Sequence, residues 1–210
     1  MQSINSWNIV KDITHILSAL KFTKLLRRKT VSSLAKDIAI VAAGIRVAHL
    51  VDVAYLKREE ASELQHQLQS LPICQPLYII HIGNEYTFIC HRHLLEHQVI
   101  HCDDYSRYYV CIDEALRGPT LQSFCTPLAQ FIHHQLKPAL SGPDNLLTID
   151  PIPSFMISLT GWLLEYPVIY VQSVADKEDA SLEWRPASGN SLSGVPLTVV
   201  TVGIGFGQER

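Results

Sequence analysis

The sequence predicts a single α+β or α/β domain in which a mixed β-sheet packs with about five helices. Apolar residues make up 47% of the 210 residues and charged residues only 18%, a composition that supports a buried core. Segments with helical spacing of apolar residues come before and after a cluster of short, β-branched runs. Two of these runs, 77–82 and 86–90, are only three residues apart, which is too few for the crossover helix of a parallel pair. We therefore expect a mixed sheet rather than a doubly wound parallel one.

Two helices are expected before the first strand. Apolar residues recur at helical spacing over 6–27, and the basic run Lys24–Lys29 would then lie in the last turn, where the helix dipole favours cations. A second helix is expected from a Ser33 cap to a stop at Gly44. For the domain organisation, we predict an N-terminal helical segment over 1–30 and a single α/β-type domain over 31–210.

The remaining elements follow from changes in the period of the apolar residues. A β-branched, alternating run predicts a strand over 45–52, and Gly83-Asn84-Glu85 suits a hairpin link with a residue at positive φ. A long polar loop is expected over 176–194. Three further helices are expected, over 57–71, 126–137 and 154–165. The second of these would have Thr126 as its cap and Pro127 at its first helical position. The other expected strands are 77–82, 86–90, 108–112, 168–171 and 195–204.

Composition and charge argue against a nucleic-acid-binding, a membrane-spanning or a secreted protein. The formal net charge of −3 argues against a dominant nucleic-acid footprint, and no apolar run approaches the roughly 20 residues that span a bilayer. The N-terminus has no apolar core of a secretory signal, but residues 1–36 carry seven Lys or Arg against Asp12 alone. We interpret this segment as an amphipathic helix, with a mitochondrial transit peptide as the alternative.

The five cysteines indicate a reducing compartment. Their number is odd, their spacing is wide, and no C-x-x-C pair or N-x-S/T sequon occurs. We expect buried, reduced thiols and a location in the cytoplasm or nucleus. The five are Cys74, Cys90, Cys102, Cys111 and Cys125.

The most specific chemical motif is the H-x-x-E-H string at His93, Glu96 and His97. On a helix, positions i and i+4 share a face, so His93 and His97 could bind one zinc ion while Glu96 acts as a base on bound water. A histidine-rich exposed helical turn accounts for the same residues. Known zinc peptidases with this string are larger and use a distant glutamate as third ligand, for which Glu165 and Glu178 are the candidates here.

Other candidate groups are less specific. The run 203–207 resembles part of a phosphate-binding glycine loop but has no following helix, so a strand end is the simpler interpretation. Cys90 with a neighbouring histidine could form a nucleophile pair. Four aspartates at strand ends could bind metal or act as bases, although turn capping is the more common use: Asp52, Asp103, Asp104 and Asp113.

Three stretches carry a resemblance to a known family. They are Gly44-Ile45-Arg46-Val47-Ala48-His49-Leu50-Val51-Asp52, then 77–85 (LYIIHIGNE), then 163–170 (LLEYPVIY) followed by Pro196-Leu197-Thr198-Val199-Val200. Together they resemble an animal family of uncharacterised proteins that contain a single domain of unknown function. The resemblance spans residues 34–204, and Tyr166-Pro167-Val168 is its most distinctive part. It implies the extent of the domain and assigns no activity, ligand or catalytic residue.

Three functions are consistent with the sequence. A soluble protein-interaction domain with an unidentified protein partner explains the apolar composition without a catalytic motif. A metal-dependent hydrolase-like enzyme using His93, Glu96 and His97 is the alternative, which would gain support if these residues and Asp52 converged on one pocket. Contact with a membrane surface or nucleic acid through Lys24–Lys29 is the third, and it predicts binding that weakens with salt.

Overall fold

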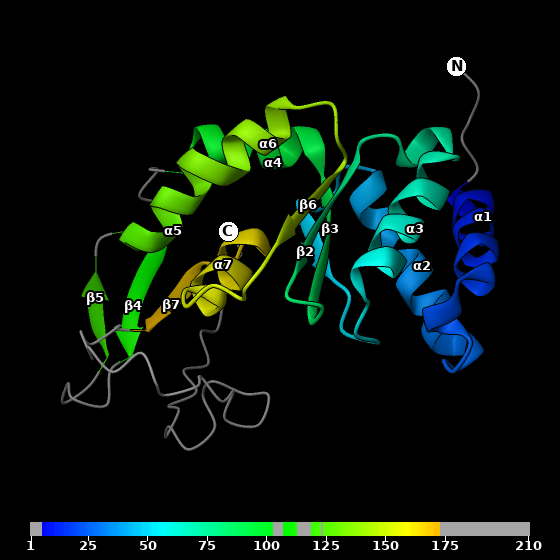
Figure 1. The fold of residues 1–210 in the computed structure, drawn as a ribbon, viewed down its shortest axis with the longest axis horizontal. Coiled ribbons are helices and arrows are strands. Elements are labelled where there is room, and N and C mark those ends of the chain that lie inside the picture. Colours follow the sequence, from blue (N-terminus) through cyan, green and yellow to red (C-terminus); the bar gives the residue numbers. More distant parts are fainter. Residues whose placement is uncertain (1–5, 103–106, 113–118, 123, 173–210) are drawn as a thin grey trace, which may run out of the picture. The chain divides into compact units, whose positions relative to one another are not determined.

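The computed structural model describes residues 6–102, 107–112, 119–122 and 124–172 (Figure 1). The elements are α1 (Ser6–Ala19), a 3-10 turn (Lys21–Thr23), α2 (Arg28–Ala42), β1 (Ala48–Leu50), α3 (Arg58–Gln69), a 3-10 turn (Pro72–Cys74), β2 (Leu77–Ile82), β3 (Tyr86–His91), α4 (Arg92–Ile100), β4 (Tyr108–Ile112), β5 (Thr120–Gln122), α5 (Thr126–Phe131), a π-helical segment (Ile132–Leu136), α6 (Lys137–Ser141), β6 (Leu146–Ile149), α7 (Met156–Leu163) and β7 (Val168–Gln172). The predicted mixed α+β fold is confirmed. Within the described residues, no helix is both long and apolar enough to cross a membrane.

The strands form two mixed sheets. The first has the order β1-β3-β2-β6, in which β2 pairs antiparallel with β3 and parallel with β6. The second has the order β5-β4-β7, in which β4 pairs antiparallel with β5 and parallel with β7. Both parallel pairs join strands that are separated by helices in the sequence, as parallel pairs require.

The first sheet is buried on both faces, which explains why all six residues of β2 are buried. Side chains of β2 alternate between two cores. Tyr78, Ile80 and Ile82 pack with residues of α4 to α7, whereas Leu77 and Ile79 pack with residues of α1, α2 and α3. Helix α1 contributes two fully buried residues, Ile13 and Leu17, to the core that it forms with α2 and α3.

Most predicted elements are present, with several corrected boundaries. The predicted helix over 6–27 ends at Ala19, because the chain turns through Lys21–Thr23 into α2. The run Lys24–Lys29 therefore does not complete the first helix but leads into the second. The second helix begins at Arg28 and not at a Ser33 cap, while Gly44, at φ 68°, follows its end as predicted.

Three further elements have boundaries that differ from the sequence prediction. The strand predicted over 45–52 is only Ala48–Leu50. Cys125, rather than Thr126, is the cap of α5, and the helical path continues past Lys137 to Ser141. The helix predicted over 154–165 is shorter, at Met156–Leu163. The hairpin prediction is confirmed, because Gly83 and Asn84 both have φ 56°.

Arg92, the first residue of α4, fixes the entry into β6. Its guanidinium donates hydrogen bonds to the carbonyl oxygens of Leu140 (2.7 Å), Gly142 (3.0 Å) and Asp144, and to Asn145 Oδ1 (2.9 Å). The same group lies 5.0 Å from the ring centroid of Tyr78, at cation–π distance. A charged group thus binds four acceptors of the segment that delivers β6 to the sheet.

Candidate functional site

Helix α4 holds the predicted H-x-x-E-H residues at the surface. It begins directly after β3, with His91 as the cap, and His91 Nδ1 accepts a hydrogen bond of 3.4 Å from the backbone N–H of Leu94. His93 and His97 are exposed, and Glu96 is half-buried. The helix is anchored by the opposite side, where Leu95 and Val99 are buried. His93 and His97 therefore lie on one helix, α4, which is not among the elements expected from the sequence.

The imidazole rings of His93 and His97 each contact the ring of a neighbouring histidine. His93 lies against His91 with a centroid separation of 5.7 Å, and His97 lies 4.4 Å from His101. Burial and the proximity of His93 lower the pKa of His91. Among the residues that the structure describes, no three His, Cys, Asp or Glu side chains gather closely enough to hold a metal ion.

The proposed third ligands lie elsewhere or outside the described part of the chain. Glu165 is exposed after α7, at φ 58°, with its Oε2 3.4 Å from the backbone nitrogen of Val47. Glu178 lies outside the described residues, as do Asp103, Asp104, Asp113 and the glycine run 203–207. A zinc site at His93 and His97 with Glu96 as base stays a prediction.

Cys90 is packed in the interior of the first sheet. It has no exposed surface, and burial raises the pKa of its thiol well above the ordinary value of 9.0. A nucleophilic cysteine needs a thiolate and access to substrate, so this environment suits an inert core residue. Asp52, in contrast, is exposed just after β1.

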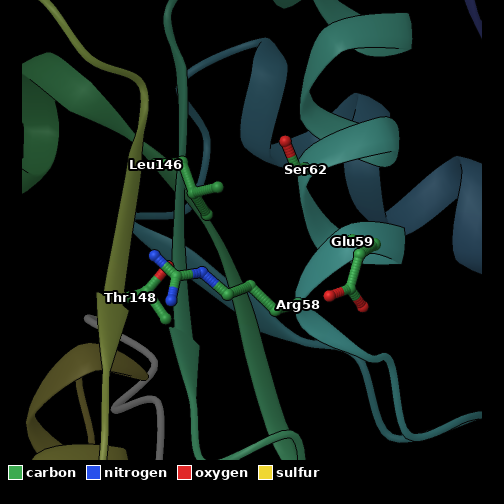
Figure 2. Close-up of a pocket in the computed structure, with 5 residues that line it drawn as sticks. All are labelled: Arg58, Glu59, Ser62, Leu146 and Thr148. Atoms are coloured by element: carbon green, nitrogen blue, oxygen red, sulfur yellow. The ribbon is translucent and has the colours of Figure 1, made fainter.

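A hollow of about 570 Å³ lies between α3 and β6 (Figure 2). Arg58 extends from the start of α3 toward Thr148 on β6, and Figure 2 shows its guanidinium on the strand side of the hollow. Glu59, Ser62 and Leu146 complete the lining. None of the predicted site residues takes part, so the convergence on one pocket that the enzyme hypothesis asks for does not occur here.

The second sheet has two faces with different surroundings. Tyr109, Ile169 and Val171 point to one face, are buried, and belong to the core that includes α4 to α7. Because side chains alternate along a strand, the residues between them point to the opposite face. That outer face is composed of apolar and aromatic side chains where polar residues are usual for a solvated sheet.

The strand register places these outer residues side by side. Val110 is opposite Leu121 on β5 and Tyr170 on β7, and Tyr108 is opposite Val168. Directly paired residues in adjacent strands share a face and lie within contact range. Leu121 is 72% exposed, Tyr108 61% and Val168 39%, while Val110 and Tyr170 are half-buried. We call these five residues the outer face.

Sequence reasoning did not identify the outer face. The sequence does contain a sign of this face, because two strands have apolar or aromatic side chains at every position and therefore on both faces. These are Tyr108-Tyr109-Val110-Cys111 and Val168-Ile169-Tyr170-Val171. Such runs suit a strand buried on both sides, and only the arrangement of the sheet reveals that one side is exposed. β5 was not predicted at all, so Leu121 had no assigned partner.

Comparison with known protein families gives a match that covers most of the chain. A family model described as a domain of unknown function, DUF4504, matches residues 16–209. No curated protein and no solved structure matches the chain. The family match covers nearly the whole chain, including both sheets.

Proposed function

This chain belongs to the DUF4504 family, and we propose that it is a protein-interaction domain that binds a protein partner through the outer face. The supporting observation is the row of exposed apolar side chains across three paired strands. Contiguous apolar surface of this kind is typical of protein–protein contact sites, whereas a single exposed leucine is ordinary. Tyrosine at the surface adds to the argument, because aromatic residues are enriched at the cores of interfaces.

The cellular setting belongs to the same proposal. All five cysteines are buried and none forms a disulfide. This arrangement suits a reducing compartment, so we propose the cytoplasm or the nucleus as the location. The animal origin that the resemblance implies also stays a prediction.

A variant of the outer face tests the proposal. Tyr108→Thr, Leu121→Thr and Val168→Thr together remove the exposed apolar surface but keep residues that favour strands. A matched control makes the same exchange at three other exposed apolar positions: Ile45, Tyr55 and Ile100, which are 72%, 79% and 68% exposed. Surface exchanges of this type change the free energy of unfolding by only about 0.5 kcal/mol each.

The measurement is quantitative capture of proteins that contact the tagged chain in cells, followed by direct binding of the purified pair. We expect a partner that the parent and the control variant retain and that the outer-face variant loses. Equal capture by all three chains would contradict the proposal. Light scattering of the purified chain shows whether the occupant is a second copy, in which case the outer-face variant would be monomeric.

A metal-dependent hydrolase-like enzyme using His93, Glu96 and His97 remains the second candidate. The supporting observation is that both histidines are exposed on one helix and that His101 lies beside His97. Elemental mass spectrometry on untagged protein tests it, beside a His93→Ala/His97→Ala variant. Near-stoichiometric zinc in the parent and none in the variant would support this candidate. Absence of metal in both, with an unchanged melting temperature, would rule it out.

A further inference from the structure

The link between α1 and α2 concentrates positive charge on a chain whose net charge is negative. Five of the nine residues over 21–29 are Lys or Arg, and no Asp or Glu occurs from 13 to 36. We call residues 21–29 the basic turn. All five cations are exposed, and within the described residues their side chains make no hydrogen bond or ion pair. The cations are Lys21, Lys24, Arg27, Arg28 and Lys29.

The basic turn has a defined shape. Thr23 is buried, and its hydroxyl lies 2.9 Å from the carbonyl oxygen of Leu20 and also reaches that of Leu17. The backbone nitrogen of Leu26 donates to the Thr23 carbonyl at 2.9 Å, and Leu26 packs against the core of α1 to α3. The cations are therefore displayed from an anchored turn rather than from a long flexible arm.

Leu25 is the most exposed large apolar residue in the described part of the chain. Its side chain is 97% exposed, between Lys24 and the pair Arg27 and Arg28. One exposed leucine alone has no special meaning. An apolar tip surrounded by cations, however, is the arrangement by which peripheral proteins combine attraction to anionic lipids with shallow insertion.

The position of the cations works against the stability of α2. Arg28 and Lys29 occupy its first turn, which has no acidic residue, and Arg27 makes no side-chain capping bond. Positive charge at a helix N-terminus is unfavourable, and α3 follows the usual rule with Glu59 and Glu60 in its first turn. A local rule that is broken without compensation is expected at functional sites.

We propose that the basic turn attaches the protein to the surface of anionic membranes. The Lys and Arg side chains bind the phosphate and carboxylate groups of the lipids, and Leu25 enters the headgroup layer. The exposed aliphatic side chain favours a lipid surface over nucleic acid, because single-stranded nucleic acid binds through aromatic stacking and duplexes through polar contacts. This inference does not depend on the outer face or on its partner.

Co-sedimentation of the full chain with vesicles tests the proposal. The probes are vesicles of phosphatidylcholine alone and vesicles with about 30% phosphatidylserine. We expect binding to the second kind only, weakened by salt and reduced about fivefold for each cation removed in an Arg28→Gln/Lys29→Gln variant. The matched control is Lys11→Gln/Lys36→Gln, which removes two exposed lysines outside the basic turn and should bind like the parent.

The contribution of Leu25 separates a membrane from other anionic ligands. Leu25→Ser should weaken vesicle binding several-fold at constant charge, whereas Ile100→Ser, at an exposed aliphatic residue outside both proposed surfaces, should not. Equal binding to both kinds of vesicle, or no effect of Leu25→Ser, would overturn the proposal. So would tight, salt-sensitive binding of inositol hexakisphosphate or duplex RNA by a chain that ignores the vesicles.

A charge-reversed variant keeps the test independent of folding. Arg28→Glu/Lys29→Glu supplies the acids that the helix N-terminus favours, so its melting temperature should rise while vesicle binding is lost. A variant that is more stable than the parent cannot have lost binding by unfolding. Retained vesicle binding in this variant would contradict the proposal.

Discussion

The imidazole of His81 and the hydroxyl of Thr87 face each other across β2 and β3, with 3.0 Å between Nδ1 and Oγ1. Both side chains are 1% exposed. The second ring nitrogen of His81 lies 3.3 Å from Asn84 Oδ1, which also accepts a 3.0 Å bond from the backbone N–H of Arg58. This polar chain ties the hairpin end to the start of α3 and satisfies a histidine in an apolar core.

Removing the Thr87 hydroxyl should leave His81 with an unsatisfied buried nitrogen. We expect Thr87→Val to lower the free energy of unfolding by about 1–3 kcal/mol, as measured by urea denaturation. In a His81→Leu background the same exchange should cost much less, because no polar partner remains. An equal cost of Thr87→Val in both backgrounds would argue that the hydroxyl does not serve His81.

Two glycines at positive φ should differ in their tolerance of a side chain. A Cβ on Gly83 would lie 2.3 Å from Ile152 Cγ1, whereas a Cβ on Gly44 would approach nothing closer than His91 Nε2 at 3.5 Å. The left-handed conformation costs about 1–2 kcal/mol in either alanine variant. The overlap adds about 1–3 kcal/mol in Gly83→Ala only. Thermal unfolding of the two variants checks this order, and a less stable Gly44→Ala protein would refute it.

Stability should fall in mild acid because of His49. Burial lowers its pKa below the ordinary value of 6.5, Asp37 and Asp52 oppose this shift, and Arg46 adds to it. The folded state therefore binds a proton more weakly than the unfolded chain. The contribution to stability is present above about pH 6.5 and is lost as the pH falls toward the lowered value.

Urea midpoints at about pH 7.5 and about pH 5.5 measure this dependence. A His49→Gln variant should show a smaller difference between the two midpoints than the parent. Some difference should remain, because burial also lowers the pKa of His91. A variant with the same difference as the parent would assign the effect to other groups.

The thiols should react slowly in the folded protein. Burial raises the pKa of Cys74 to about 12 and that of Cys90 in the same direction, and all five cysteines are buried. At neutral pH we expect little reaction with Ellman's reagent until the chain unfolds, because the reagent needs an accessible thiolate. The same titration in denaturant should count five thiols. Rapid reaction of one thiol in the native state would instead identify a reactive cysteine.

Much of the fold could be predicted because some segments carry an unambiguous period. The hairpin of β2 and β3 combines two β-branched runs with a Gly-Asn link, and α3 has both apolar spacing and early acids. The segments α4, β5 and β6 were not predicted, and the two strands, of four residues or fewer, are too short to display a period. No breaker residue marks the end of α1, which is instead followed by a turn in which the Thr23 hydroxyl donates to the carbonyl oxygens of Leu17 and Leu20.

The candidate site was less predictable than the fold, for a physical reason. The H-x-x-E-H string is local, so it can be recognised in the sequence, although the helix α4 that carries it was not expected. The outer face depends on the pairing of three strands that are distant in the sequence, and Leu121 meets Val110 only in that register. Leu25 could be recognised as part of a basic run, but its exposure depends on the turn that ends α1.

The hydrogen bonds of Arg92 have a consequence for synthesis on the ribosome. They reach the carbonyl of Leu140, 48 residues later. The N–H of Ile79 in β2 and that of Gly83, just after β2, likewise donate to the carbonyls of Asn145 and Ile149. A nascent chain is completed from the N-terminus, so β2 emerges well before β6. During that interval β2 is an open edge that can pair with other chains. The growing polypeptide should therefore depend most on chaperones after β2 has emerged and before β6 has been translated.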